Sequence, residues 1–448
     1  MSTMQKKSAL LPLLLALAAV AALWAPAAQA QNLVELYRSA RDYDAAYQSA
    51  RSLYEANLAK AEQAKAGILP SAGLSSGVTR TNFENSNPAT TRNFTTQSAS
   101  LNASQPLYRP GNWATYEQGK RQVELSQAQL EAAEQDLIVR TSQTYFDVLA
   151  SQDTLTFVRA QKAAVAEQLA SAKRNFEVGT STITDSREAQ ARYDLVIAQE
   201  IAAENDLRVK KITLDQLVGK TDAEPKSLQV PLALPPLVPA EVNAWVQPSQ
   251  ELHPTVRQAL ANLEVAKLEI DKAEAGHKPT LDLTASYGVQ RNLNGSATVA
   301  NANFRTNAAS VGLALNLPLF AGFATQNRIR ETLSLEEKAR SDLEGAKRGV
   351  ALGTRSAFFG VLSGQGQVKA LEAAEASSQS ALDANKLGYQ VGVRINIDVL
   401  NAQSQLFQTK RDLAQARYNV LVGVLKLRQA NGTLTPEDLL LINSLLVQ

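Results

Sequence analysis

The chain has 448 residues, with 45 Lys and Arg, 43 Asp and Glu, two His and no Cys. The absence of Cys excludes disulfides and a lipid-modified N-terminal Cys, and two His are too few for a metal cluster, so we expect no metal and no cofactor. Residues 1–30 carry two of the basic groups and no acidic one. The remaining chain therefore has no net charge, which argues against a nucleic-acid partner.

The first 30 residues have the form of a secretory signal peptide. Lys6 and Lys7 precede an apolar run from Leu10 to Trp24, and Ala28-Gln29-Ala30 forms a small-x-small cleavage site. An uncleaved anchor helix is the alternative, but the run is short and contains Pro12. We predict export and cleavage after Ala30.

The rest of the chain contains one structural unit that occurs twice. The segment TYFDVL at 144–149 matches AFFGVL at 357–362, and FEVG at 176–179 matches YQVG at 389–392, both at an offset of 213 residues. PLY at 106–108 matches PLF at 318–320 at an offset of 212. Agreement at a nearly fixed offset indicates an internal duplication with length changes confined to loops.

Each repeat is predicted to contain a lead helix, two strands and two long helices. Long stretches without Gly or Pro predict the first repeat's long helices. In the second repeat's first long helix, six Gly within residues 345–366 suggest bends or a break. Six Pro make the connector irregular, with the C-terminal tail as its expected neighbour. The predicted parts are repeat 1 at 31–220 (helix 33–66, β-hairpin 70–107, helices 113–178 and 181–218), a Pro-rich equatorial connector at 221–248, repeat 2 at 249–432 (helix 249–275, β-hairpin 280–320, helices 324–389 and 395–431) and a C-terminal equatorial segment at 433–448.

The four strand segments alternate between apolar and polar residues. In TLDLTASYGV (280–289) every second residue from Leu281 onward is apolar, and 311–319 repeats this with one Val and four Leu. Segments 72–78 and 97–103 show the pattern more weakly. The apolar face could cover a soluble sandwich or lie under helices. Because the helices are Ala-rich and two hairpins are few for a sandwich, we favour contact with lipid.

Four strands cannot close a membrane barrel by themselves. An open sheet in lipid would leave unpaired backbone groups along both edges, each at a cost of several kcal/mol. The edges must therefore pair with other copies of the chain. Since the smallest membrane barrels have eight strands, two, three or more subunits would satisfy the hydrogen bonding.

Several stretches resemble the TolC family of outer-membrane efflux channels: FEVGTSTITD at 176–185, GHKPTLDLTAS at 276–286, GYQVGVRINIDVLNAQ at 388–403 and GTLTPEDLLLIN at 432–443. The resemblance implies a mixed membrane α/β fold: a homotrimer with a 12-stranded transmembrane β-barrel, four strands per chain, continued by a long α-helical barrel in the periplasm. It also implies export of drugs or secreted proteins. The implied partners are a periplasmic adaptor protein, an inner-membrane transporter of the RND, ABC or MFS class, and outer-membrane lipid.

The resemblance further implies a gate at the periplasmic end, closed by polar links and lined by acidic residues. It assigns Asp398 to the pore lining, Tyr389 and Arg394 to gate holding, and their partners to Thr184 and Asp185. From the residues alone, other roles remain open. Asp185 and Asp398 both follow a turn and could cap helices, Arg394 could be a solvated helix-end charge, and Tyr389 could pack the turn.

Asn401 departs from the family pattern. The resemblance places a second acidic position of the pore at this residue, three positions after Asp398 on the same helical face. A trimer of this chain would therefore carry three carboxylates there instead of six. We expect a weaker attraction for cations at the tip.

Aromatic residues stand where the strands give way to the helices. Their position suits a belt at the membrane interface, and packing at an ordinary strand–helix corner would suit it equally. These residues are Tyr108, Trp113, Phe320 and Phe323.

Nothing in the sequence indicates an enzyme. GLSSG at 73–77 matches the G-x-S-x-G pattern of hydrolases, but that motif requires a strand–turn–helix elbow and here it lies within a strand segment. The alternative to a channel is a soluble periplasmic coiled-coil adaptor without a barrel.

Overall fold

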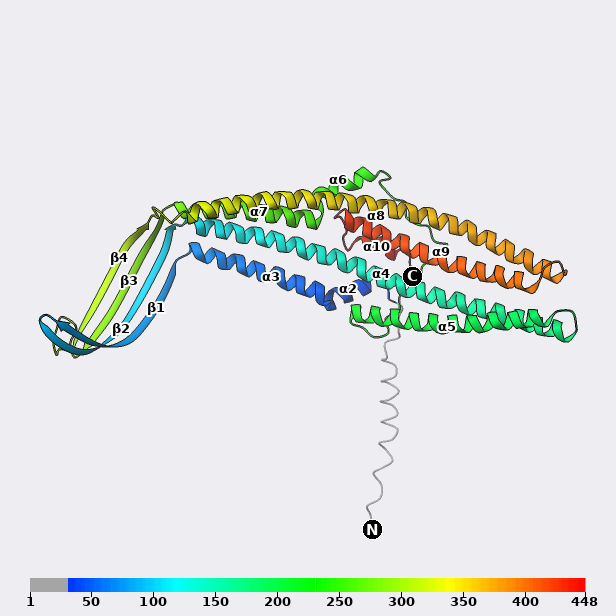
Figure 1. Ribbon diagram of the computed structural model, residues 1–448, viewed down its shortest axis with the longest axis horizontal. Coiled ribbons are helices and arrows are strands. Elements are labelled where there is room, and N and C mark those ends of the chain that lie inside the picture. The colour runs from blue at the N-terminus through cyan, green and yellow to red at the C-terminus, as the bar shows by residue number, and fades with distance from the viewer. Residues whose placement is uncertain (1–30, 230, 448) are drawn as a thin grey trace, which may run out of the picture. The chain divides into compact units, whose positions relative to one another are not determined.

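The computed structural model describes residues 31–229 and 231–447, so the predicted signal peptide lies outside the described part (Figure 1). The chain forms two compact units. The sheet unit comprises residues 49–133 and 248–352, and the helical unit comprises residues 31–48, 134–247 and 353–447. Within the described ranges, no helix combines the length and the apolar character needed to cross a bilayer.

The sheet unit contains a four-stranded antiparallel sheet in the order β1-β2-β3-β4. The strands are β1 (Ser71–Ser86), β2 (Ala89–Tyr108), β3 (Thr280–Leu293) and β4 (Phe304–Asn316). Pairing of β2 with β3 joins the hairpin of the first repeat to that of the second. The sheet thus has β1 and β4 as its two edges.

The register places the alternating apolar residues on one face of the sheet. Leu74 lies opposite Leu101, Leu101 opposite Tyr287, and Leu283 opposite Leu313. These side chains are exposed in the chain, Leu74 by 79%. The other face carries Ser, Thr and Asn, with cross-strand hydroxyl bonds such as Ser75 to Ser100 at 2.8 Å. The predicted two-faced sheet is confirmed, and its apolar face is not covered by the described part of the sheet unit.

The last strand is shorter than predicted. β4 ends at Asn316, whereas the hairpin was expected to reach residue 320. Pro318 has no N–H to donate to the ladder, so the chain leaves the sheet just before it. In β2 the ladder passes through Pro106, and its register shifts between Pro106 and Tyr108.

Both lead helices are broken where one helix was predicted. The first consists of α2 (Leu33–Tyr43) and α3 (Ala45–Lys65), because Asp44 is extended and accepts a bond from the Tyr47 amide at 2.8 Å. The second consists of α6 (Val242–Leu252) and α7 (Pro254–Glu274), and His253 caps α7. A capping side chain stabilises each new helix start. Short turns η1 (Ala66–Ile68) and η2 (Ala275–His277) then lead into β1 and β3.

The helical unit is built from two antiparallel helix pairs. α4 (Pro110–Glu177) pairs with α5 (Ile183–Val218), and α8 (Ala324–Gln390) pairs with α9 (Asn396–Ala430) (Figure 1). α4 and α8 begin in the sheet unit and continue into the helical unit. α8 is one continuous helix, so the break expected from the six Gly within 345–366 is absent. Each Gly lowers helix propensity by only about 1 kcal/mol, which the long hydrogen-bonded helix tolerates.

The connector and the C-terminal tail lie side by side, as expected. Leu228 and Leu446 form an antiparallel bridge, and the Gln229 amide donates to the Leu445 carbonyl at 2.9 Å. α10 (Asp438–Asn443) lies in the tail. α6 begins at Val242, inside the connector that was predicted to be irregular, and carries Pro248 within it.

Candidate functional site

Two equivalent turns lie at the same end of the helical unit (Figure 1). Gly179 joins α4 to α5 with φ 78°, and Gly392 joins α8 to α9 with φ 79°. These left-handed conformations favour glycine because a Cβ would be strained there. The turns bring the predicted gate residues to this end, which we call the tip (residues 175–192 and 388–401).

Asp185 completes a capping box at the start of α5, in which Thr182 is the N-cap residue. Its carboxylate accepts from the Thr182 amide at 3.1 Å and from the Ser181 hydroxyl at 2.6 Å, while the Thr182 hydroxyl accepts from the Asp185 amide. The Ser181 bond, opposed in part by burial, and the bonds from Thr182 hold the pKa of the Asp185 carboxyl below its usual range. Thr184, beside it on the first turn of α5, is exposed.

Within the single chain, Tyr389 contacts Asn175 and Arg394 contacts Asp398. The Tyr389 hydroxyl accepts from Asn175 Nδ2 on α4 at 3.2 Å, so it links the two helix pairs. Arg394 lies 3.7 Å from the Asp398 carboxylate, one turn along its own segment. Within the single chain, neither residue bonds to Thr184 or Asp185 among the interactions of the described residues.

Further polar links between the helix pairs were missed from the sequence. Gln168 of α4 donates to Asn396 of α9, and Asn396 Nδ2 donates to the Asp185 carbonyl at 3.4 Å. Arg192 Nη2 of α5 donates to Asn401 Oδ1 of α9 at 2.7 Å. Asn396 is fully buried. An Asn at the start of a long helix resembles an ordinary cap residue, so its sequence gave no signal of this role.

An apolar seam joins the same three helices. Leu400 of α9 is fully buried against residues of α4 and α5. Burial of one Leu contributes about 1.5–3 kcal/mol. The other buried members are Val165, Leu169 and Ala172 of α4, with Ala189 and Val196 of α5.

A partly buried polar pair connects α4 and α9 farther from the tip. The Tyr418 hydroxyl donates to the Asp153 carboxylate at 2.6 Å, and the Tyr418 ring stacks on Phe146 with centroids 5.5 Å apart. Burial raises the pKa of the Asp153 carboxyl although the Tyr418 bond opposes that rise. Burial and the neighbouring carboxylate likewise raise the pKa of Tyr418.

The four predicted interface aromatics are exposed in the chain, namely Tyr108, Trp113, Phe320 and Phe323. Phe320 and Phe323 meet edge-on, with centroids 5.5 Å apart. Phe323 has φ 61°, a costly conformation for a bulky residue. Arg109, which directly follows Tyr108 at the end of β2, binds both carboxylate oxygens of Asp282, at 2.8 and 2.6 Å.

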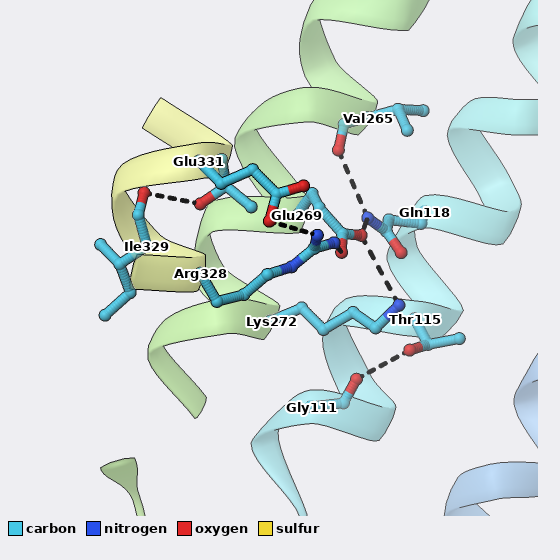
Figure 2. A network of polar contacts seen from close by, with 10 residues as sticks. Gly111, Thr115, Gln118, Val265, Glu269, Lys272, Arg328, Ile329 and Glu331 are labelled. Carbon is cyan, nitrogen blue, oxygen red and sulfur yellow. Dashed lines mark hydrogen bonds and ion pairs between the residues drawn. The ribbon is translucent and has the colours of Figure 1, made fainter. Parts of the chain in front are cut away.

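Glu269 of α7 ties three helices of the sheet unit together (Figure 2). It accepts from Gln118 of α4 and from Arg328 of α8, each at 2.7 Å, and lies 3.5 Å from Lys272. Burial favours a higher pKa for the Glu269 carboxyl, but these hydrogen bonds and positive charges outweigh it and lower the pKa. Arg328 also pairs with Glu331 at 2.9 Å.

We expect Glu269→Gln to destabilise the protein at neutral pH by about 1–2 kcal/mol, because it weakens charge-assisted hydrogen bonds. The folded pKa is lower than the unfolded one, so this contribution is complete above the ordinary Glu pKa of about 4.3 and is lost as the pH falls through the folded value. Thermal unfolding measured against pH should show the variant and the wild type converging in acid. A difference that persists unchanged there would contradict the ionic role.

No group of three His, Cys, Asp or Glu in residues 31–229 and 231–447 is arranged to hold a metal ion. Ser75, the central Ser of the G-x-S-x-G pattern, lies within β1. Its hydroxyl bonds to Ser100 on the neighbouring strand, which differs from the elbow geometry of a hydrolase.

The sequence matches the family described as outer membrane efflux protein over residues 36–220 and 245–433, one range in each repeat. Outer membrane protein TolC of Vibrio cholerae is 33% identical over 415 residues, covering 93% of this chain and 94% of the relative. Proteases secretion protein PrtF of Dickeya chrysanthemi is 30% identical, covering 98% and 94%. The solved outer membrane protein VceC of Vibrio cholerae has the same fold, with a TM-score of 0.76 at 19% identity over 89% of this chain and 96% of that one.

Proposed function

Because the chain belongs to the outer membrane efflux protein family, we propose that three copies assemble into one passive exit duct. The protein is an outer-membrane channel, and the family and fold agree on this. The observation that carries the proposal is the four-stranded sheet with an exposed apolar face and two edges. Three such sheets joined at β1 and β4 would give 12 strands, enough for a water-filled lumen lined by the polar face.

The proposed partners follow from the relatives. PrtF and alkaline protease secretion protein AprF of Pseudomonas aeruginosa are named for protease secretion. We therefore infer a role in type I protein secretion, multidrug efflux or both, with a periplasmic adaptor and an inner-membrane RND, ABC or MFS transporter. The protein would have a transport role and no catalytic one. The soluble adaptor alternative has no support, because the family match covers both repeats.

The tip would be the gate of this duct. Opening requires the α8/α9 pair to separate from the α4/α5 pair, which breaks the links of Tyr389 and Asn401. Asp398, held by Arg394, would line the pore as one carboxylate per chain. Asp185 would support the gate by fixing the start of α5 through its bonds with Thr182, and Thr184 would stand beside it on the exposed first turn.

The exposed aromatics are proposed to form the inner interface belt of the barrel. Phe320 and Phe323 cluster at the end of β4, and Tyr108 and Trp113 at the end of β2. Amphipathic or large rings at this level suit the boundary between hydrocarbon and headgroups. The costly backbone conformation of Phe323 supports a role for its exposed ring.

We expect Tyr389→Ser and Arg394→Ser each to raise single-channel conductance in a planar bilayer. Tyr389→Ser removes the bond from Asn175, and Arg394→Ser removes the ion pair that holds Asp398 near the Gly392 turn. The first change removes a link between the helix pairs, and the second frees the Asp398 carboxylate that would line the pore. Lys386→Ser is the matched control, because Lys386 is an exposed residue of α8 one turn before Tyr389. Conductance equal to the control in both variants would remove Tyr389 and Arg394 from the gate.

A further inference from the structure

We propose that Arg192 and Asn401 form the clasp that keeps α9 closed against α5, and that Arg192 sets the charge of the tip. This inference rests on the proposed duct and names a residue of its gate. Arg192 is the tenth residue of α5 and Asn401 the sixth of α9, so the clasp lies just above both turns. The guanidinium donates to the amide oxygen at 2.7 Å.

The clasp stands at the edge of the apolar seam. Leu400, the neighbour of Asn401, is fully buried, and Val196, one turn after Arg192, is almost so. The Arg192–Asn401 bond itself is exposed, so its strength comes from the charge of the guanidinium and the short distance. The seam and the clasp therefore stabilise the same contact between α5 and α9, the seam through burial of apolar side chains and the clasp through a directional hydrogen bond.

Charge explains why this residue pair differs from an ordinary ion pair. Asn401 is neutral, so the positive charge of Arg192 remains at the tip, and no ion pair of Arg192 occurs among the described residues. Asp398 has Arg394 as its own partner. Across these two contacts, the guanidinium groups of Arg192 and Arg394 are balanced by the single carboxylate of Asp398, which opposes cation attraction.

A double-mutant cycle tests the clasp. Arg192→Gln and Asn401→Ala should each raise the open-to-closed ratio of the full-length channel in a planar bilayer by about tenfold, the effect of losing one charge-assisted bond. The double variant should equal the single ones, because all three lack the same bond. Arg192→Lys, which can still donate, should stay closer to the wild type. Additive effects, or no effect of either change, would overturn the clasp.

A second experiment tests whether Arg192 sets the charge of the tip. Asn401→Asp should change the reversal potential across a KCl gradient little while Arg192 is present, because the new carboxylate pairs with the guanidinium. In the Arg192→Gln background the same change should raise cation selectivity. An equal gain in both backgrounds would show that residue 401 does not face Arg192, and would overturn the proposal.

Controls separate this inference from the proposed function. Arg208→Gln removes the same charge from an exposed site on α5 farther from the tip and should behave as the wild type. The mass of each detergent-extracted oligomer shows that the variants assemble. If the wild-type protein forms no channel, the proposed function as a duct is wrong. If it forms channels that Asp398→Ala makes less cation-selective, but the cycle is additive, only the clasp is wrong.

Discussion

Leu313→Arg should abolish assembly of the channel in the outer membrane. Leu313 lies three residues before the end of β4 at Asn316, opposite Leu283, and is exposed by 66% on the apolar face. Arg on the lipid-facing side of a strand costs up to about 2–4 kcal/mol, less toward the interfaces, and a trimer would carry three of them. β4 is also an edge strand, so its pairing with the next copy would be disturbed. The measurement is the amount of oligomer extracted from outer membranes with detergent.

Ala308→Arg provides the matched control. Ala308 lies in the same strand, opposite Gly288 on the polar face, where the proposed lumen is wet. This variant should assemble at nearly the wild-type level. Normal assembly of Leu313→Arg, or equal loss in both variants, would contradict a lipid-facing role for the apolar face.

Leu400→Ala should both destabilise the helical unit and loosen the gate. Leu400 is fully buried between α4 and α5, and removing a buried Leu side chain costs about 2–5 kcal/mol because it leaves a cavity. The lost packing lies between α9 and the α4/α5 pair, which is the contact that must open in the proposed gate. We therefore expect a lower Tm by circular dichroism and a higher open probability in planar bilayers.

Leu195→Ala is the control for this change. Leu195 lies on α5 within the same region, but its side chain is 49% exposed, so its truncation leaves no closed cavity. It should shift the Tm much less than Leu400→Ala. A Leu400 variant that is destabilised but keeps wild-type conductance would separate packing from gating and count against the seam as part of the gate.

Local pattern was enough to predict the sheet and most helices. Period-2 alternation identifies the apolar face of the strands without knowledge of their neighbours, and the structure sets Leu101 opposite Tyr287 on that face. Repeated stretches such as FEVG and YQVG indicated that both halves share these elements. The helix breaks at Asp44 and His253 were missed because a polar residue within a helical stretch reads as a surface residue until its side chain is seen to cap.

The sequence by itself determined export, duplication, the two-faced sheet and the long helices, because each follows from a pattern among residues that are near one another in the chain. Only the tertiary structure decided the partners at the tip: Asn175 for Tyr389 and Arg192 for Asn401, which stand 214 and 209 residues apart. One residue of helix turns a side chain by about 100°, so these pairings depend on how each long helix is rotated about its axis. That rotation is set by burial of residues such as Leu400 between the helices, and no local pattern records it.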